Sequence, residues 1–274
     1  MVIERYDDPV AYADLVSPTL LRDEARYNLE LAVVSRVARG ETFGTGTPLL
    51  LTVDGAPALM TPPHNVLMQA LPAKSAPALA EYLHAEGIGF PGALGRPDAV
   101  TAFAECYAAL SGAGYQVTRE QGAYELRELV PPAPAPGALR TATLDDAGLV
   151  LRWCRAFTDE VGLPPLENER VRDRITLEGG GFWLWEDGAP VSLAGCGGYT
   201  PNGARIGPVY TPPELRGRGY ASAVTAGVTK LMLDRGRTST FLYTDLANPT
   251  SNKIYRAMGY RHVADVREVS FERR

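Results

Sequence analysis

The chain has 274 residues, of which 45% are hydrophobic, and its formal net charge is −5. This length is sufficient for two domains of common size. The acidic balance argues against a nucleic-acid partner, because such partners select a clustered basic surface. No apolar stretch approaches the roughly 20 residues that a membrane-spanning helix requires, so we expect no membrane association.

The first residues and the cysteines favour a cytoplasmic location. Residues 1–8 lack the basic segment and the apolar core of a secretion signal. Cys106, Cys154 and Cys196 are an odd number at scattered spacings, and the three histidines are scattered as well. Neither set has the spacing of a disulfide framework or of a metal site. We therefore expect reduced, buried thiols and no bound metal.

The first half of the chain predicts a mixture of helices and strands. Its clearest local signal is the turn dipeptide Asp54-Gly55, which lies between two apolar runs and is typical of a hairpin. The expected elements, in chain order, are a helix over 20–37, the two strands of the hairpin within 48–60, a strand over 89–94, a helix over 97–109 and a strand from Tyr115.

A proline-alternating stretch divides the chain near its middle. Residues 130–137 read Val-Pro-Pro-Ala-Pro-Ala-Pro-Gly, a composition that cannot form a helix or an inner strand. It predicts an extended, semi-stiff linker. We therefore expect one domain over 1–130, a linker over 131–137 and a second domain over 138–274.

The second half again alternates strands and helices. A second turn dipeptide, Asp187-Gly188, predicts another hairpin. The expected elements are a strand over 140–143, a helix over 144–156, a helix around 167–177, strands over 182–185, 191–196 and 204–210, a helix over 222–235, a strand over 240–245 and a short helix that begins at Thr250 or Ser251.

The most informative segment is the loop between the strand that ends at Tyr210 and the helix over 222–235. Two prolines are followed by a basic, glycine-broken stretch, Arg216-Gly217-Arg218-Gly219. Glycines allow the backbone to approach a ligand closely. The first turn of the helix adds N–H donors without intrahelical partners and the positive end of the helix dipole. This combination predicts a site for a diphosphate.

A second signal lies one helix and one strand further on. Asn252, Tyr255 and Gly259-Tyr260 stand at fixed spacings in a helix that Gly259 can end. Together with Arg216-x-x-Gly219-x-Ala221, this pattern resembles the GNAT superfamily of acetyl-CoA-dependent acyltransferases. The resemblance covers about 139–271.

The resemblance implies an α/β (α+β) fold, in which a mixed, mostly antiparallel sheet has helices on its faces and a splayed central strand. Pro208 independently favours a bulge or gap in that strand, because proline cannot donate to a ladder. The resemblance also implies acetyl-CoA as co-substrate. The implied contacts are the CoA diphosphate with the backbone of Arg216, Gly217, Arg218, Gly219, Tyr220 and Ala221, the pantetheine arm with Val209, Tyr210 and Thr211, and polar contacts from Asn248 and Asn252.

Tyr255 matches the tyrosine that protonates the departing thiolate in many GNAT enzymes. A phenol is protonated at neutral pH and can act as a general acid. The general base is not apparent, because the strand before the loop contains no carboxylate. The remaining candidates are Asp159, Glu160, Asp245 and a water chain that ends at the hydroxyl of Tyr210.

The two halves share a short sequence. Asp54-Gly55-Ala56-Pro57 and Asp187-Gly188-Ala189-Pro190 each lie between two strands. We interpret the first half as a degenerate GNAT-like copy, with an unrelated α/β domain as the alternative. It contains no counterpart of the 216–221 loop, so we expect no CoA there. We expect it to cover the catalytic sheet and to form one wall of the acceptor site.

Two classes of function remain open. The first is transfer of an acetyl group from acetyl-CoA to a primary amine of a small molecule or protein, and the second is a non-catalytic acyl-CoA-binding sensor or scaffold. The intact loop and Tyr255 favour catalysis, whereas the missing carboxylate favours the alternative. The oligomeric state is expected to be a monomer or a homodimer.

Overall fold

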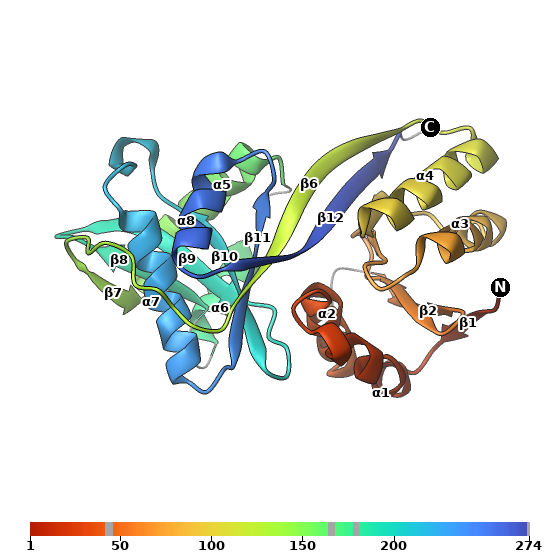
Figure 1. The fold of residues 1–274 in the computed structure, drawn as a ribbon, viewed down its shortest axis with the longest axis horizontal. Coiled ribbons are helices and arrows are strands. Elements are labelled where there is room, and N and C mark those ends of the chain that lie inside the picture. Colours follow the sequence, from red (N-terminus) through yellow and green to blue (C-terminus); the bar gives the residue numbers. More distant parts are fainter. Residues whose placement is uncertain (42–45, 164–167, 178–180, 273–274) are drawn as a thin grey trace. The chain divides into compact units, whose positions relative to one another are not determined.

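The computed structural model describes residues 1–41, 46–163, 168–177 and 181–272 (Figure 1). The chain forms two compact units, each built from more than one segment. The first consists of Met1–Tyr124, Tyr243–Asn248 and His262–Arg274, and the second consists of Glu125–Leu242 and Pro249–Arg261. The predicted domains are two continuous parts of the chain on either side of 131–137, whereas each unit of the structure combines separate segments of the chain.

The first unit is built on seven strands in the order β1-β2-β3-β4-β5-β12-β6. The pairs from β1 to β4 are antiparallel, β4 and β5 are parallel, and β5 and β12 are antiparallel. The elements are β1 (Ile3–Tyr6), α1 (Pro9–Leu20), α2 (Asn28–Ala38), β2 (Leu49–Val53), β3 (Ala56–Met60), β4 (Val66–Leu67), α3 (Ala76–Ala85), β5 (Gly92–Gly95), α4 (Pro97–Ser111), β6 (Tyr115–Leu126) and β12 (Arg261–Phe271).

Helices cover both faces of this sheet, as Figure 1 shows. Successive side chains of a strand point to opposite faces, so Leu49 and Leu51 pack in a core with α3 and α4. Leu50, between them, packs with α1 and α2 in a second core. This double coverage explains why β2 is apolar at nearly every position instead of alternating.

The second unit repeats this plan in the order β11-β10-β9-β8-β7, in which only β10 and β11 are parallel. Phe182 and Leu184 face a core with α5 and α6, whereas Trp183 faces a core with α7. The elements are β7 (Ala138–Thr141), α5 (Ala147–Val161), α6 (Asn168–Thr176), β8 (Phe182–Glu186), β9 (Pro190–Gly197), β10 (Gly203–Tyr210), α7 (Tyr220–Asp234), β11 (Ser239–Asp245) and α8 (Pro249–Ala257).

The two halves of the sequence have the same order of elements. Each runs strand, two helices, three strands, helix, strand, helix, strand, from β1 to β6 and from β7 to β12. The parallel pair occupies the same place in both, as β4 with β5 and as β10 with β11. The predicted fold class is confirmed, and the repeated order supports the interpretation of two related copies.

The helix predicted over 20–37 is wrong in its extent. The structure has α1 over Pro9–Leu20, a 3₁₀ turn at Leu21–Asp23 and α2 from Asn28. The start of α1 is fixed by Asp8, whose side chain accepts hydrogen bonds from the N–H groups of Val10 and Ala11. Helix α3 was not expected from the sequence at all.

Candidate functional site

The central strand β10 has the predicted irregularity. Its register with β9 shifts between Ile206 and Val209, on either side of Pro208. Its parallel ladder with β11 ends at the pair Arg205 and Phe241, although β10 continues to Tyr210. The second part of β10 therefore leaves this ladder, which is the splay that the fold prediction included.

The loop after β10 presents its backbone to solvent. Gly217 and Gly219 both have left-handed conformations, with φ of +77° and +83°, and both are exposed. Gly219 is the residue that precedes α7, so no side chain caps the first turn of that helix. The N–H groups of the first turn have no intrahelical partners. This backbone geometry is compatible with an anion at the loop, and the anion site itself stays a prediction.

The side chain of Arg216 has partners within the protein. Its Nε donates to the carbonyl of Thr211 at 2.9 Å, and its Nη2 donates to the two carboxylate oxygens of Glu160 at 2.6 and 2.8 Å. The guanidinium also lies 5.8 Å from the centre of the Tyr210 ring. Arg216 therefore ties the loop to the end of β10 and to α5, and its backbone is the part left for a ligand.

The other residues predicted to contact CoA differ in their exposure and in the unit to which they belong. Arg218 is exposed, and it donates to the carbonyl of Glu214 at 3.4 Å. Asn252 is buried on α8 in the second unit. Asn248 is exposed in the segment that belongs to the first unit. Val209 and Thr211 lie on the irregular part of β10 and just after it.

Tyr255 and Tyr260 lie edge to face in the second unit, with ring centres 5.9 Å apart. The hydroxyl of Tyr260 lies 2.8 Å from that of Thr229 and 2.9 Å from that of Thr240, so it forms hydrogen bonds with both. The hydroxyl of Tyr255 has no hydrogen-bond partner among the described residues. Burial raises the pKa of Tyr255 to about 12. Tyr255 therefore keeps its proton at neutral pH and has it available for a ligand.

A pocket of about 600 Å³ adjoins these elements, a volume suited to a small organic ligand. It lies between the first turn of α7, the length of α8 and the proline-rich stretch. Its lining residues are Pro132, Ala133, Ser222, Pro249, Thr250, Lys253, Ile254, Ala257 and Met258.

The comparisons with known proteins agree with the predicted fold. Residues 189–269 match the family model described as FR47-like protein. A GCN5-related N-acetyltransferase from Sphaerobacter thermophilus is similar in structure, with a TM-score of 0.64 and 20% identity over 98% of this chain and 95% of that one. The C-terminal half of this chain has a GNAT fold.

Two further solved structures are also similar over both halves. A Drosophila protein has a TM-score of 0.69 and 12% identity, over 99% of this chain and 98% of that one. An acetyltransferase of the GNAT family from Colwellia psychrerythraea has a TM-score of 0.52 and 15% identity, over the full length of both chains. No match was found among curated protein sequences.

Two of the three carboxylates that the sequence offers as a general base accept hydrogen bonds within the protein. Both oxygens of Glu160 accept from Arg216. Asp245 accepts from the N–H of Ala247 at 2.7 Å, which fixes a turn in the first unit. Asp159 is exposed. Burial raises the pKa of Tyr210, so this phenol also stays neutral.

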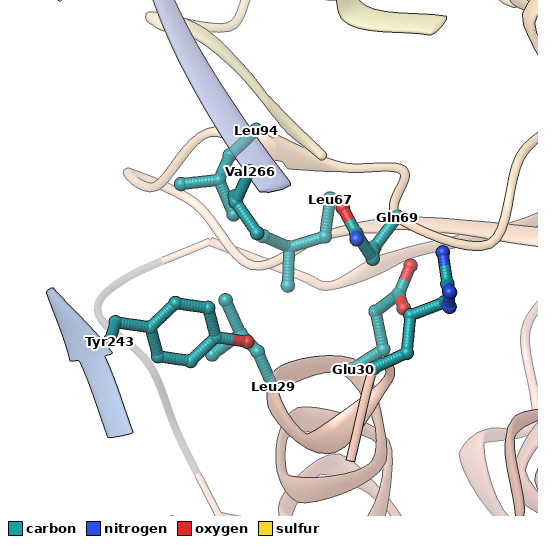
Figure 2. A pocket seen from close by; sticks show the side chains of 8 residues that line it. Leu29, Glu30, Leu67, Gln69, Leu94, Tyr243 and Val266 are labelled. Atoms are coloured by element: carbon teal, nitrogen blue, oxygen red, sulfur yellow. The ribbon is translucent and has the colours of Figure 1, made fainter. Parts of the chain in front are cut away.

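A second, much smaller pocket lies within the first unit (Figure 2). Its volume of about 10 Å³ is room for about one water molecule. Glu30 is 1% exposed, and its Oε1 accepts from the N–H of Ala70 at 3.2 Å. Its Oε2 and the Oε1 of Gln69 have no hydrogen-bond partner among the described residues. Figure 2 shows both side chains at one end of the pocket and Tyr243 at the other.

Burial raises the pKa of Glu30 to about 8. Glu30 is therefore protonated at neutral pH, and its carboxyl can donate a hydrogen bond to an acceptor in this pocket. This residue was not predicted from the sequence. The available signal was its position within the apolar run Leu29–Leu31 of a helix, where an acid is rarely tolerated.

Within residues 1–41, 46–163, 168–177 and 181–272, no group of three or more His, Cys, Asp and Glu side chains could hold a metal ion. No helix in the same ranges is both long and apolar enough to cross a membrane.

Proposed function

We propose that this protein transfers an acetyl group from acetyl-CoA to a primary amine of a small molecule or protein. The observation that carries the proposal is the exposed loop with left-handed Gly217 and Gly219, which leads from the irregular end of β10 into an uncapped α7. We assign the activity to 138–274, with 131–137 as the connection and 1–130 without a CoA loop.

In this proposal the chain binds and orients acetyl-CoA. Backbone N–H groups from Arg216 to Ala221 hold the diphosphate, since a helix N-terminus favours negative charge. The irregular part of β10, from Val209 to Thr211, pairs with the pantetheine arm. Fixing the thioester beside the amine lowers the entropic barrier to reaction.

The reaction is a direct attack in a ternary complex. The neutral amine attacks the thioester carbonyl, a C–N bond forms, the C–S bond breaks, and CoA leaves as a thiolate. The positively charged nitrogen of the tetrahedral intermediate loses its proton to water, and the product is a neutral amide. Tyr255 donates a hydrogen bond to the departing sulfur. A thiol with a pKa near 8.5 is a stronger acid than this phenol, so the phenol contributes mainly by stabilising the thiolate.

A second function is favoured by one observation. Glu160 is paired with Arg216, and Asp245 is used in a turn, so neither carboxylate is set up as a base. A protein that binds acyl-CoA as a sensor or scaffold would need no base. The acyl-CoA site is common to both functions.

The experiment that tests the proposal combines calorimetry with a thiol-release assay. Acetyl-CoA should bind to the full chain, and addition of a panel of amines should release free thiol with at least one of them. Binding without thiol release from any amine would support the sensor or scaffold. The absence of any binding to acetyl-CoA would overturn both functions.

A further inference from the structure

A positive charge without a negative partner lies beside the irregular part of β10. Arg174 is partly buried on α6. Its Nη2 donates to the carbonyl oxygens of Gly181, Cys196 and Gly207, at 3.4, 3.3 and 3.4 Å. These distances exceed the usual value of about 2.9–3.0 Å, so the three carbonyls hold this nitrogen only weakly. No carboxylate of the described residues forms an ion pair with Arg174.

The surroundings of Arg174 do not neutralise its charge. Among the described residues, the acidic groups that affect its pKa are the thiols of Cys154 and Cys196 and the phenol of Tyr199. Burial raises the pKa of both thiols to about 11 and that of Tyr199 to about 12, so all three are uncharged at neutral pH. Burial lowers the pKa of Arg174, and the positive charge of Arg205 lowers it further. A guanidinium nevertheless stays protonated at neutral pH, so an anionic ligand would supply the counter-charge that Arg174 lacks.

The guanidinium of Arg174 is held in place and keeps N–H groups that can donate to a ligand. Its central carbon lies over the ring of Phe182, 4.2 Å from the ring centre, which is a cation–π contact. Gly195 leaves room for it, because a Cβ there would lie 2.9 Å from Nη2. Nε and Nη1 have no hydrogen-bond partner among the described residues, and neither of these two atoms is fully buried. A planar guanidinium with free N–H groups matches the planar geometry of a carboxylate.

Arg174 lies close to the place where the thioester is proposed to bind. Gly207, whose carbonyl accepts from Arg174, precedes Pro208 within the register shift of β10. The pantetheine arm is proposed to pair from Val209 onward, and two residues of an extended strand span at most about 7 Å. A ligand whose carboxylate binds Arg174 can therefore place an amine beside the acetyl group when the amine is only a few atoms away from the carboxylate.

We propose that the acceptor is an amino acid, whose carboxylate binds Arg174 while its neutral amine attacks the thioester. This inference rests on the proposed function, because it names the class of acceptor at the same site. The C–N bond of an N-acetyl amino acid forms, the C–S bond breaks, CoA leaves as a thiolate, and the nitrogen loses one proton to water. Arg174 neither gains nor loses a proton. It holds the amine near the carbonyl carbon, which lowers the entropic barrier to reaction.

The first arm of the test compares acceptors with the full, unmodified chain in the thiol-release assay. A panel of amino acids is measured beside the primary amides of the same amino acids, which keep the amine and lose the negative charge. At least one amino acid should have a kcat/KM about 10-fold or more above that of its amide, mainly through a lower KM. This comparison needs no variant, so it does not depend on the folding of one.

The second arm tests whether Arg174 causes the preference. Arg174→Gln should raise the KM of the preferred amino acid about 10-fold or more and leave the KM of its amide unchanged. Arg174→Lys keeps the charge but not the planar guanidinium, so its KM should lie between those of the other two proteins. Arg172→Gln is the matched control, because Arg172 is exposed on the same helix, and it should behave as the unmodified protein does.

The outcomes separate this inference from the proposed function. If amines release thiol but no amino acid is preferred over its amide, the inference is overturned and the proposed function stands. The same conclusion follows if Arg174→Gln keeps the preference, or if it impairs the amino acid and the amide equally, as a purely structural role would. If acetyl-CoA binds and no amine of any kind releases thiol, both the inference and the proposed transfer are overturned.

Discussion

The two halves differ most clearly where the fourth strand of each half ends. In the first half, β4 stays paired with β5, and the N–H of Met68 extends the ladder by donating to the carbonyl of Leu94 at 2.9 Å. In the second half, the ladder between β10 and β11 ends at Arg205 while β10 continues. The parallel pair β4 and β5 therefore stays together, whereas β10 separates from β11. We call the first half the closed half and the second half the open half.

The segments that follow these strands differ in the same way. After β4, Met68 and Leu71 are fully buried and fill the space beside the strand. After β10, Gly217 and Gly219 leave an exposed backbone without side chains. The same order of elements can thus provide either a packed core or a place for an anion, and a few residues decide which.

The largest expected effect tests the open half. Gly219→Val would place a β-branched residue at a φ of +83°, in a region that disfavours it by about 1–2 kcal/mol, and would crowd the anion site. We expect acetyl-CoA binding to weaken by about 100-fold or more, as measured by calorimetry.

The matched variant is Gly87→Val in the first unit. Gly87 also has a left-handed conformation, with a φ of +63°, and open space around its Cβ position. It should show a similar backbone strain and normal acetyl-CoA binding. Equal binding by the two variants would contradict the assignment of the anion site.

The next effect concerns the stability of the closed half. The pKa of Glu30 is raised from 4.5 to about 8 in the folded protein, so the folded state binds a proton that the unfolded state releases between these values. The free energy of unfolding should therefore fall with rising pH across this window, by up to about 1.4 kcal/mol per pH unit. Glu30→Gln should remove this fall.

Urea denaturation at pH 5, 7 and 9 measures this difference. Glu105→Gln is the control, because Glu105 is exposed on α4, and it should retain the pH dependence of the unmodified protein. A Glu30→Gln variant that loses stability with pH as steeply as the control would show that the carboxyl is not the cause.

A smaller effect separates the two tyrosines of the open half. Tyr255→Phe removes the hydroxyl proposed to contact the departing sulfur, and kcat should fall by about 10- to 100-fold with little change in the affinity for acetyl-CoA. Tyr260→Phe leaves the hydroxyls of Thr229 and Thr240 unpaired, so it should lower the free energy of unfolding by about 1–3 kcal/mol.

Thiol-release kinetics and thermal unfolding of both variants test this division. The prediction fails if Tyr260→Phe reduces kcat of the folded protein as much as Tyr255→Phe does. In that case the pair would act together, and the hydroxyl of Tyr255 would have no special role.

The smallest effect concerns Glu160. Because this carboxylate is paired with Arg216 and its side chain is 44% exposed, Glu160→Gln should change kcat by less than about 3-fold. If Glu160 were the general base, its replacement would lower kcat by about 100-fold or more. The pH profile of kcat/KM distinguishes the two cases, since loss of a base would also remove a limb of the profile.

Local signals predicted much of this molecule. The Asp-Gly pairs at 54–55 and 187–188 predicted both hairpins, because a tight turn depends mainly on its own residues. The glycine loop and the helix after it were predicted for the same reason. The sequence also indicated the irregular β10 through Pro208, because proline cannot donate within a ladder.

The features that were missed depend on residues far apart in the chain. Glu160 and Arg216 are 56 positions apart in the sequence, and no local pattern near either residue predicts their ion pair. The burial of Glu30 depends on the segment after β4, which supplies Gln69 and Ala70. Residues 130–137 look like a free linker in the sequence, and only the contacts with Met258 and Trp185 show that they are fixed.

The position of β12 has a consequence for synthesis on the ribosome. Residues Arg267–Ser270 pair with Gly92–Gly95 of β5, and Val269 is fully buried among the side chains of the first unit. A nascent chain that has emerged only as far as the second unit thus carries an unpaired edge at β5 and an unfilled core. Completion of the amino-terminal fold must wait for residues that are translated long after it, and during that interval the edge of β5 lacks its neighbouring strand.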